Sequence, residues 1–198
     1  MRQRGDTIIE VVLAVTVFSL IAVGALSVMN QGTAIAQQSL EISLVRDQMD
    51  SQADALRYAH NAYIVNLDQS DAPAITVWNK IIESPVNTAQ DFTSINNARQ
   101  CNLPSSGEYF ALDIKKLDGT SGSPIITTIN STPTTFAQLH YGPSSVVSDG
   151  LWTQVVHTSS SGTIPGYYDF HIRACWLAPG QSIPVTLATI VRLYDPAP

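Results

Sequence analysis

Apolar residues are concentrated in one long run near the start of the chain, from Ile8 to Met29. Glu10 is the only charged residue in this run. At the helical rise of about 1.5 Å per residue, the run forms a helix about 33 Å long, which is enough to cross the hydrocarbon core of a bilayer. The pattern therefore predicts a membrane helix that carries one carboxylate.

A different pattern follows, in which apolar residues return every seven positions and charged residues lie mostly between them. The repeating positions are Ile35, Ile42, Met49, Leu56 and Tyr63. No proline occurs before Pro73, so we predict one continuous helix from about Thr7 to Leu67, which Gly24 and Gly32 allow to bend. Such a helix is about 90 Å long. One globular domain cannot bury that length, so lipid or other subunits must cover its first half.

The second half of the chain shows the alternation and the turn residues that are typical of β-strands. After a loop-like segment with short helices predicted at 75–83 and 88–99, strand patterns alternate with Gly, Pro and Ser clusters. The predicted strands are residues 109–115, 124–130, 135–141, 151–158, 167–176 and 184–194. Because they follow one another directly, we predict an antiparallel meander. The fold class is then α+β, with the long helix packed on a sheet.

The alternation is clearest in the predicted strand 167–176. One side of this strand carries Tyr168, Phe170, Ile172, Ala174 and Trp176, and the other carries Tyr167, Asp169, His171, Arg173 and Cys175. Successive side chains of a strand point to opposite faces of the sheet. We expect the first set to pack on the long helix and the second to meet water or the segment that carries Cys101.

The chain has two cysteines, Cys101 and Cys175. An oxidising, extracytoplasmic location favours a disulfide between them; the alternative is two separate buried thiols. A disulfide would hold the segment around Cys101 across the outer face of the sheet. By restricting the unfolded chain it would contribute about 4.5 kcal/mol.

Composition, charge and the lack of catalytic motifs mainly exclude classes of function. Only 13% of the 198 residues are charged, and the formal net charge is −6. An acidic surface repels phosphate groups, so no nucleic acid is expected as a partner. His140, His157 and His171 lie on separate predicted strands, without the close spacing of metal ligands. No nucleophile motif or phosphate loop stands out, so we expect neither enzyme activity nor a metal or cofactor.

Two features of the N-terminal run are unusual. Gly5, which follows the basic residues Arg2 and Arg4, precedes the apolar run, whereas the cleavage site of a secretory signal peptide follows it. Cleavage after Gly5 would therefore leave the helix on the mature protein. A carboxylate near the start of a membrane span costs about 2.5–3.5 kcal/mol on insertion scales and usually marks a function with a partner. Glu10 is expected to have such a partner.

In these residues the chain resembles the prepilins of type IV pili and the related pseudopilins of type II secretion. Their shared signature is a short basic leader that ends in glycine, a new N-terminal residue, threonine, two aliphatic residues and a glutamate. Residues Gly5 to Glu10 match this order, and the apolar residues from Val11 to Leu20 continue it. Asp6 departs from the pattern, because the family most often has phenylalanine or methionine there.

The resemblance implies a type IV pilin-like fold in four parts. These are a leader over 1–5, an apolar helix over 6–32, its amphipathic continuation over 33–70 and a β-rich head over 71–198. The precursor would lie in the cytoplasmic membrane with its basic leader inside and its head outside. A prepilin peptidase would cut between Gly5 and Asp6, and the pilus assembly machinery would build the product into a surface filament for adhesion or motility.

The resemblance also implies an assembly role for two acids. In a filament the apolar helices of many copies bundle together, and the Glu10 carboxylate pairs with the N-terminal amine of a neighbouring copy. Asp6 places a second acid beside that amine, where it either shares the pairing or weakens it. Self-association and membrane lipid are thus the expected environments of the apolar helix.

The sequence leaves three assignments open. The first is a structural subunit of a type IV pilus, either major or minor, and the second is a pseudopilin of type II secretion. The third is a membrane-tethered surface binding protein that does not polymerise. That protein would need neither cleavage at Gly5 nor a partner for Glu10.

Overall fold

The structure is a computed structural model that describes residues 6–97, 100–119, 122–131, 133, 135–143, 145–162 and 164–196. Gly5 and the side chain of Asp6 lie outside what it describes. The chain is α+β and divides into two compact units, Met1–Leu40 and Glu41–Pro198.

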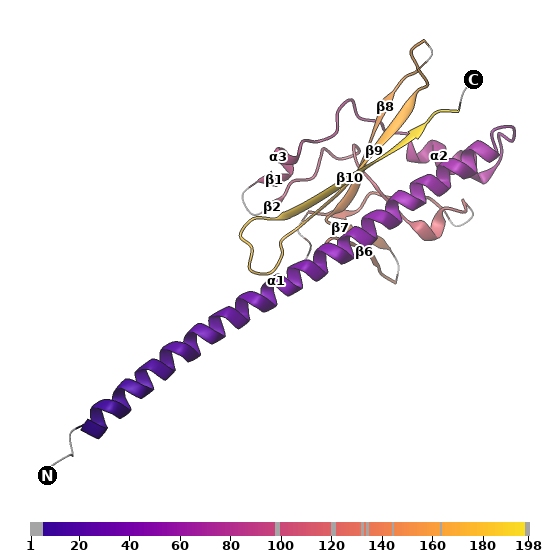
Figure 1. The fold of residues 1–198 in the computed structure, drawn as a ribbon. Coiled ribbons are helices and arrows are strands. Elements are labelled where there is room, and N and C mark those ends of the chain that lie inside the picture. Colours follow the sequence, from indigo (N-terminus) through magenta and orange to yellow (C-terminus); the bar gives the residue numbers. More distant parts are fainter. Residues whose placement is uncertain are drawn as a thin grey trace. The chain divides into compact units, whose positions relative to one another are not determined.

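Helix α1 spans Asp6–Val65 and belongs to both units (Figure 1). The prediction of one helix over about 7–67 is therefore confirmed to within two residues at each end. Gly24 and Gly32 lie inside it, and a methyl group placed on either glycine would meet no atom within 4 Å. Packing within the described part of the chain therefore does not require a glycine at either position.

In the second unit, the later part of α1 packs against a three-stranded antiparallel sheet (Figure 1). Its strands are β8 (Leu151–Thr158), β9 (Tyr167–Trp176) and β10 (Val185–Tyr194), in the order β10–β9–β8. Phe170 of β9 stands opposite Val155 on one side and Val191 on the other. These three strands form the predicted meander.

The remaining elements of the second unit are short. Helix α2 is Pro73–Ile81, α3 is Phe92–Ile95 and the 3₁₀ helix η1 is Ile114–Lys116. Strand β1 (Asn96–Asn97) pairs with β2 (Gln100–Cys101), and β3 (Ala111–Leu112) pairs with β4 (Ile125–Ile126). Strand β7 (Val146–Asp149) lies between β5 (Ile129–Asn130) and β6 (Gln138–Tyr141).

The prediction of one antiparallel meander was wrong for the strands before β8. They form separate small sheets, and β5 pairs with β7 in parallel. The predicted strand 109–115 keeps only β3, because the Asp113 carboxylate accepts a hydrogen bond from the Lys115 N–H at 3.2 Å and starts η1. The helix predicted over 88–99 is reduced to α3, and β7 was not predicted.

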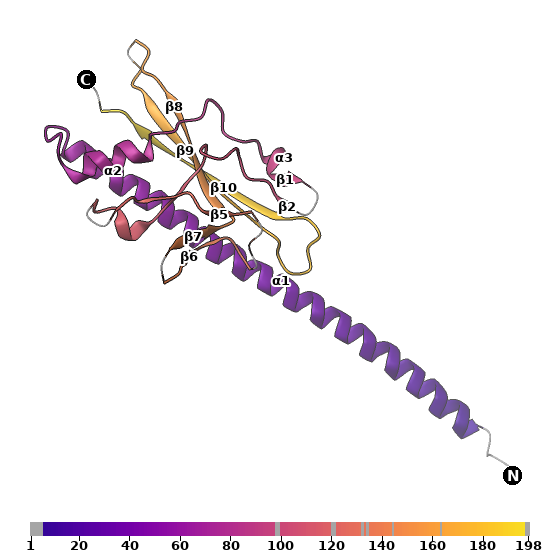
Figure 2. The same ribbon diagram turned by 180° about the vertical axis from the view of Figure 1, so that it is seen from behind.

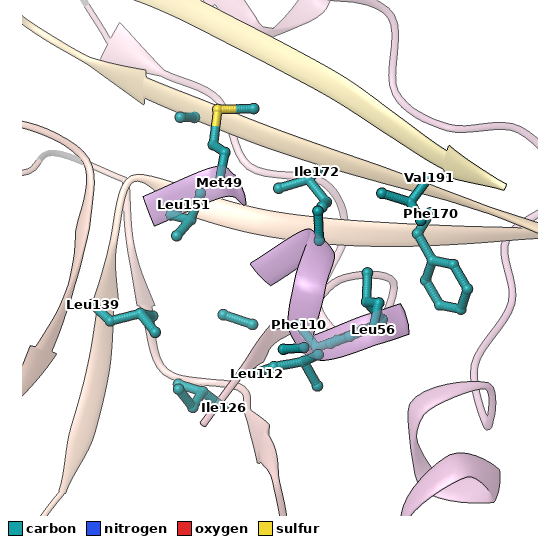
Figure 3. Packing of buried hydrophobic residues seen from close by; sticks show 14 of the residues in the cluster. Met49, Leu56, Phe110, Leu112, Ile126, Leu139, Leu151, Phe170, Ile172 and Val191 are labelled. Atoms are coloured by element: carbon teal, nitrogen blue, oxygen red, sulfur yellow. The ribbon is translucent and has the colours of Figure 1, made fainter. Parts of the chain in front are cut away.

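The hydrophobic core of the second unit lies between α1 and the inner face of the sheet (Figure 3). Met49 and Leu56, two of the positions repeated every seven residues, are 4% and 0% exposed. They belong to one cluster with Phe170 and Ile172 of β9, so the predicted inner face of this strand is confirmed. Ile35, at the start of the repeat, belongs to the first unit and is 67% exposed.

Trp78 of α2 fixes the C-terminal part of α1 to the sheet. Its ring lies 5.0 Å from His60 and 5.6 Å from Tyr63 on α1, and 5.8 Å from Phe170 on β9, measured between centroids. His60 also makes a 2.9 Å hydrogen bond through Nε2 to the carbonyl oxygen of Tyr194 on β10. The helix is thus held at this end by aromatic packing and by one buried polar contact.

Gln52 joins α1 to β3 in the middle of the core, where it is only 1% exposed. Its Nε2 donates to the carbonyl oxygen of Leu112 at 2.9 Å, and its Oε1 accepts from the Leu112 N–H at 2.8 Å. The side-chain amide therefore pairs with β3 as a neighbouring strand would. This satisfies two buried backbone groups that would otherwise be costly to leave unpaired.

Replacing Gln52 with methionine preserves side-chain volume but removes both hydrogen bonds. We expect the free energy of unfolding to fall by about 2–4 kcal/mol, because two buried groups of Leu112 lose their partner. Guanidinium unfolding of the detergent-solubilised full chain, followed by near-UV circular dichroism, measures the change. Gln48→Met is the matched control, since Gln48 is half-buried and accepts only a 3.4 Å bond from the Leu139 N–H. An equal loss at both positions would contradict the role given to Gln52.

Candidate functional site

The first candidate site is the apolar surface of α1 in the first unit. This part of the helix is long and apolar enough to cross a membrane, and none of its most apolar stretch is buried within the described chain. Phe18 and Leu20 are 72% and 75% exposed. Moving one such side chain out of water is worth about 1.5–3 kcal/mol. The helix therefore requires an apolar environment that the described part of its own chain does not supply.

Two hydroxyl groups within the apolar run, those of Thr16 and Ser19, are paired inside the helix. Thr16 Oγ1 donates to the carbonyl oxygen of Leu13 at 2.8 Å, and Ser19 Oγ donates to that of Val15 at 2.7 Å. Side chains that bond to their own helix in this way are tolerated in lipid. These hydroxyls are therefore compatible with an apolar surrounding.

Glu10 differs from these hydroxyls. Its side chain is exposed, and within the described residues its carboxylate has neither an ion-pair nor a hydrogen-bond partner. Asp6 is the first residue of α1 and precedes Glu10 by four positions. Acids near a helix N-terminus are favoured by the helix dipole, but a carboxylate in lipid still needs a partner. Gly5, the predicted cleavage site, lies outside the described residues.

The second candidate feature is the disulfide between Cys101 and Cys175, which the structure contains as predicted. With Ile95 and Trp152 the two cysteines form a small apolar cluster on the face of β9 opposite the helix. Figures 1 and 2 both show α3, β1 and β2 across the sheet from the later part of α1. The bond thus fixes the segment around Cys101 to the outer face of the sheet.

Replacing both cysteines with alanine is expected to lower the free energy of unfolding by about 4 kcal/mol, because the 74-residue separation leaves a large loop unconstrained in the unfolded chain. Guanidinium unfolding of the full chain measures this loss. Adding a reductant to the unsubstituted chain should reproduce it, and the double variant should not respond to the reductant. A change below 1 kcal/mol would contradict the stabilising role.

Charged groups on the open part of the outer face are paired with one another. Arg192 donates from Nε and Nη2 to the two carboxylate oxygens of Asp169, each at 2.7 Å, and its guanidinium lies 4.0 Å from the centroid of the Tyr167 ring. The hydrogen bond from Arg192 lowers the pKa of Asp169. Burial, together with the positive charge of Arg173, lowers the pKa of His171, while Asp169 acts in the opposite direction.

His171→Gln tests whether this histidine makes the head sensitive to acid. Because its pKa in the folded chain lies below the ordinary 6.5, the unfolded chain binds the proton first, and stability falls as pH drops through 6.5. The variant should lose less stability than the unsubstituted chain between about pH 7.5 and pH 5. Guanidinium unfolding across that range measures the slope. Parallel slopes in the two chains would exclude His171 as a source of acid sensitivity.

The three histidines considered as metal ligands lie in different places. His157 stacks on Tyr168 at 4.4 Å between ring centroids, and its Nε2 is 3.4 Å from Asp195 Oδ2. His140 is exposed on β6, and His171 is on the outer face of β9. In the part of the chain that the structure describes, no three His, Cys, Asp or Glu side chains come together to hold a metal.

An acidic groove of about 690 Å³ lies between α1 and the η1 segment. Its lining includes the carboxylates of Asp47, Asp50, Asp54 and Asp118, together with Lys115 and Tyr58. Sequence analysis did not group these residues, because η1 reaches the helix only through the tertiary fold. The groove carries negative charge, but its acidic lining by itself does not identify a ligand.

Sequence analysis also missed the contact between Glu41 and Trp176. The indole N–H of the fully buried Trp176 donates to Glu41 Oε2 at 2.9 Å. A buried tryptophan usually has a hydrogen-bond acceptor for its N–H, which is the signal that would have called for one. The contact ties the C-terminal end of β9 to the first residue of the second unit.

Comparison with known proteins gives no match: no family model matches the chain, and no curated protein or solved structure matches it. The functional argument therefore depends on this chain's own residues. They provide an apolar helix that requires covering, one carboxylate within it, and a disulfide-bonded α+β head.

Proposed function

We propose that the chain is a structural subunit of a type IV pilus, major or minor. It is made as a membrane precursor, cleaved after Gly5 and polymerised through its N-terminal helix into a surface filament for adhesion or motility. The observation that carries the proposal is the apolar helix that the described chain leaves uncovered, together with the Glu10 carboxylate near its start, which has no partner among the described residues.

Lipid alone provides a suitable environment for only some side chains of this helix. It covers the apolar side chains, but it leaves the Glu10 carboxylate without a partner. A bundle of such helices covers the apolar side chains with protein and also offers a partner. Cleavage after Gly5 frees the amine of Asp6, about 6 Å along the helix axis from Glu10. A neighbouring copy displaced by about one turn would bring its amine beside the carboxylate, which fixes the axial register of the copies.

The head supports an extracytoplasmic location. Its disulfide is of the kind that persists in oxidising compartments. Loss of Arg2 and Arg4 with the leader would leave 8 of the 10 basic residues against 16 acidic ones. Such a charge keeps a surface domain soluble and does not favour nucleic acid. Prepilin peptidase, the assembly machinery and, before assembly, membrane lipid are the partners that the proposal requires.

Glu10→Gln tests the pairing while keeping the size of the side chain. We expect incorporation into filaments to fall about tenfold or more, because the amine of the neighbouring copy is left buried without its partner. Membrane insertion and cleavage of the precursor should continue. Immunoblots of sheared filaments and of the membrane fraction measure both quantities. Asp47→Asn, which removes an exposed acid from the part of α1 that belongs to the second unit, is the matched control and should assemble normally.

Mass spectrometry of the N-terminal peptide separates this proposal from its alternatives. A peptide that begins at Asp6 in sheared filaments supports a processed subunit, and its abundance distinguishes a major from a minor one. A processed chain that stays within a secretion complex would indicate a type II secretion pseudopilin. A chain that still begins at Met1 and remains in the membrane would refute the proposal in favour of a tethered surface binding protein.

A further inference from the structure

Strand β10, yellow in Figure 1, forms one edge of the three-stranded sheet. Asp195, which follows the strand, donates its N–H to the carbonyl oxygen of Gly166, just before β9. In an antiparallel pair, successive residues direct their backbone groups alternately toward the neighbouring strand and away from it. The 2.9 Å bond from His60 of α1 to the carbonyl oxygen of Tyr194 agrees with this alternation. The odd-numbered residues of β10 therefore bond to β9, and the backbone groups of the even-numbered residues point out of the sheet.

The outward-pointing backbone groups in the middle of β10 are those of Thr186, Ala188 and Ile190. Among the described residues, none donates to these carbonyl oxygens or accepts from these N–H groups. Residues 185–191 contain no charge and no proline, which are the features that commonly block an exposed sheet edge. This edge therefore offers a row of donors and acceptors that another extended backbone can satisfy.

The opposite edge of the same sheet shows how such groups are satisfied within the head. The Val86 N–H donates to the carbonyl oxygen of Val155 on β8 at 2.8 Å, and Phe110 and Thr153 exchange two backbone hydrogen bonds at 3.0 and 2.6 Å. Neighbouring segments thus pair with the edge of β8. No described segment does the same for the middle of β10.

A groove of about 250 Å³ lies between the open edge and α1, within the second unit. Its lining consists of Arg46, Met49, Asp50, Leu187, Ala188 and Thr189. Small-molecule sites usually measure about 300–1,000 Å³, so this groove is better suited to a pair of side chains. Helix and strand run in the same direction, because residues 46–50 lie beside 187–189 and His60 lies beside Tyr194.

Two opposite charges, Arg46 and Asp50, lie on the helical side of the groove. Both side chains are exposed, and neither forms an ion pair or a side-chain hydrogen bond with another described residue. They are four residues apart, which is about 6 Å along the helix axis. Side chains two residues apart on one face of a strand are separated by about 6.6 Å. A strand added to β10 would therefore place one side chain beside each charge.

We propose that the open edge of β10 binds an extended segment of a partner protein, antiparallel to residues 186–190. The partner side chains opposite Leu187 and Thr189 point into the groove, because these two residues line it. In the antiparallel direction the segment reaches Asp50 first and Arg46 two residues later. It therefore carries a basic residue, one further residue and then an acidic residue. Strand β10 lacks such a pair of charges, so the β10 strand of a second copy is not the expected occupant.

Two blocked, fluorophore-labelled peptides test the inference on the full chain in detergent micelles. Acetyl-Thr-Val-Lys-Thr-Glu-Val-Thr-amide has the proposed order of charges. The control, acetyl-Thr-Val-Glu-Thr-Lys-Val-Thr-amide, has the same composition with the two charges exchanged. Fluorescence anisotropy measures the Kd of each peptide. We expect the first to bind about tenfold more tightly, because two ion pairs replace two contacts between like charges.

Exchange of the two charges on α1 gives the matched variant. Arg46→Asp combined with Asp50→Arg keeps the net charge, and it leaves the core unchanged because both side chains are exposed. This variant should prefer the exchanged peptide by a similar factor. N-methylation of the central threonine of the first peptide removes the N–H that would donate to the Ala188 carbonyl oxygen. The methylated peptide should bind about tenfold more weakly or worse.

The absence of binding by either peptide at about 1 mM would overturn the inference. Equal affinity for the two orders of charge, or a preference of the unsubstituted chain for the exchanged order, contradicts the assigned orientation and likewise overturns it. Binding that survives N-methylation would show that charge alone holds the peptide, which excludes strand addition. The inference concerns the second unit alone, so the proposed pilus function, which rests on Glu10 and the apolar helix, stands after any of these results.

Discussion

An apolar helix surface has to be shielded from water. In this chain the part of α1 after Leu40 is covered by the chain's own sheet, whereas the described chain does not cover the part before it. From Val45 to Leu56 the buried face of α1 is matched by the inner face of β9 and its neighbours. Before Glu41, side chains such as Phe18 and Leu20 meet nothing that the described chain provides. The same helix therefore belongs to a self-sufficient head at one end and requires an external apolar environment at the other.

The three-stranded sheet is small, and specific contacts attach further segments to it and to α1. Gln52 pairs with the backbone of Leu112 and attaches β3 to the helix. The disulfide adds the segment around Cys101 to the outer face of β9, which would otherwise be solvated. Trp78 joins α1, α2 and β9 through its ring. Each contact connects segments far apart in sequence, which is why the short strands can persist.

The polar groups of the apolar helix show why membrane insertion and assembly make different demands. Thr16 and Ser19 satisfy their hydroxyls within the helix, so lipid imposes little cost on them. Glu10 cannot do so, because a carboxylate only accepts hydrogen bonds and cannot donate one to a backbone carbonyl as these hydroxyls do. The proposed filament differs from lipid in supplying a cation at that position.

Local patterns in the sequence determined the features that depend on periodicity. The seven-residue repeat located the buried side of α1, and the alternation in β9 separated its inner from its outer face, which in turn placed Cys175 where it could meet Cys101. The residues of the proposed processing and assembly site, Gly5, Asp6 and Glu10, also came from the sequence, through the resemblance of residues 5–10 to the start of prepilins. Burial of a continuous apolar stripe leaves a regular signal, because every member of the stripe faces the same neighbour.

Only the tertiary structure decided how the short strands pair and which polar groups meet. Strand β5 runs parallel to β7, the chain leaves β3 for η1 at Asp113, and Gln52 and Glu41 find their partners on distant segments. A two-residue strand is too short to show a period, and a hydrogen bond between residues 60 or 135 positions apart leaves no local pattern. The sequence therefore determined which faces are apolar, whereas long-range geometry decided what satisfies the polar groups between them.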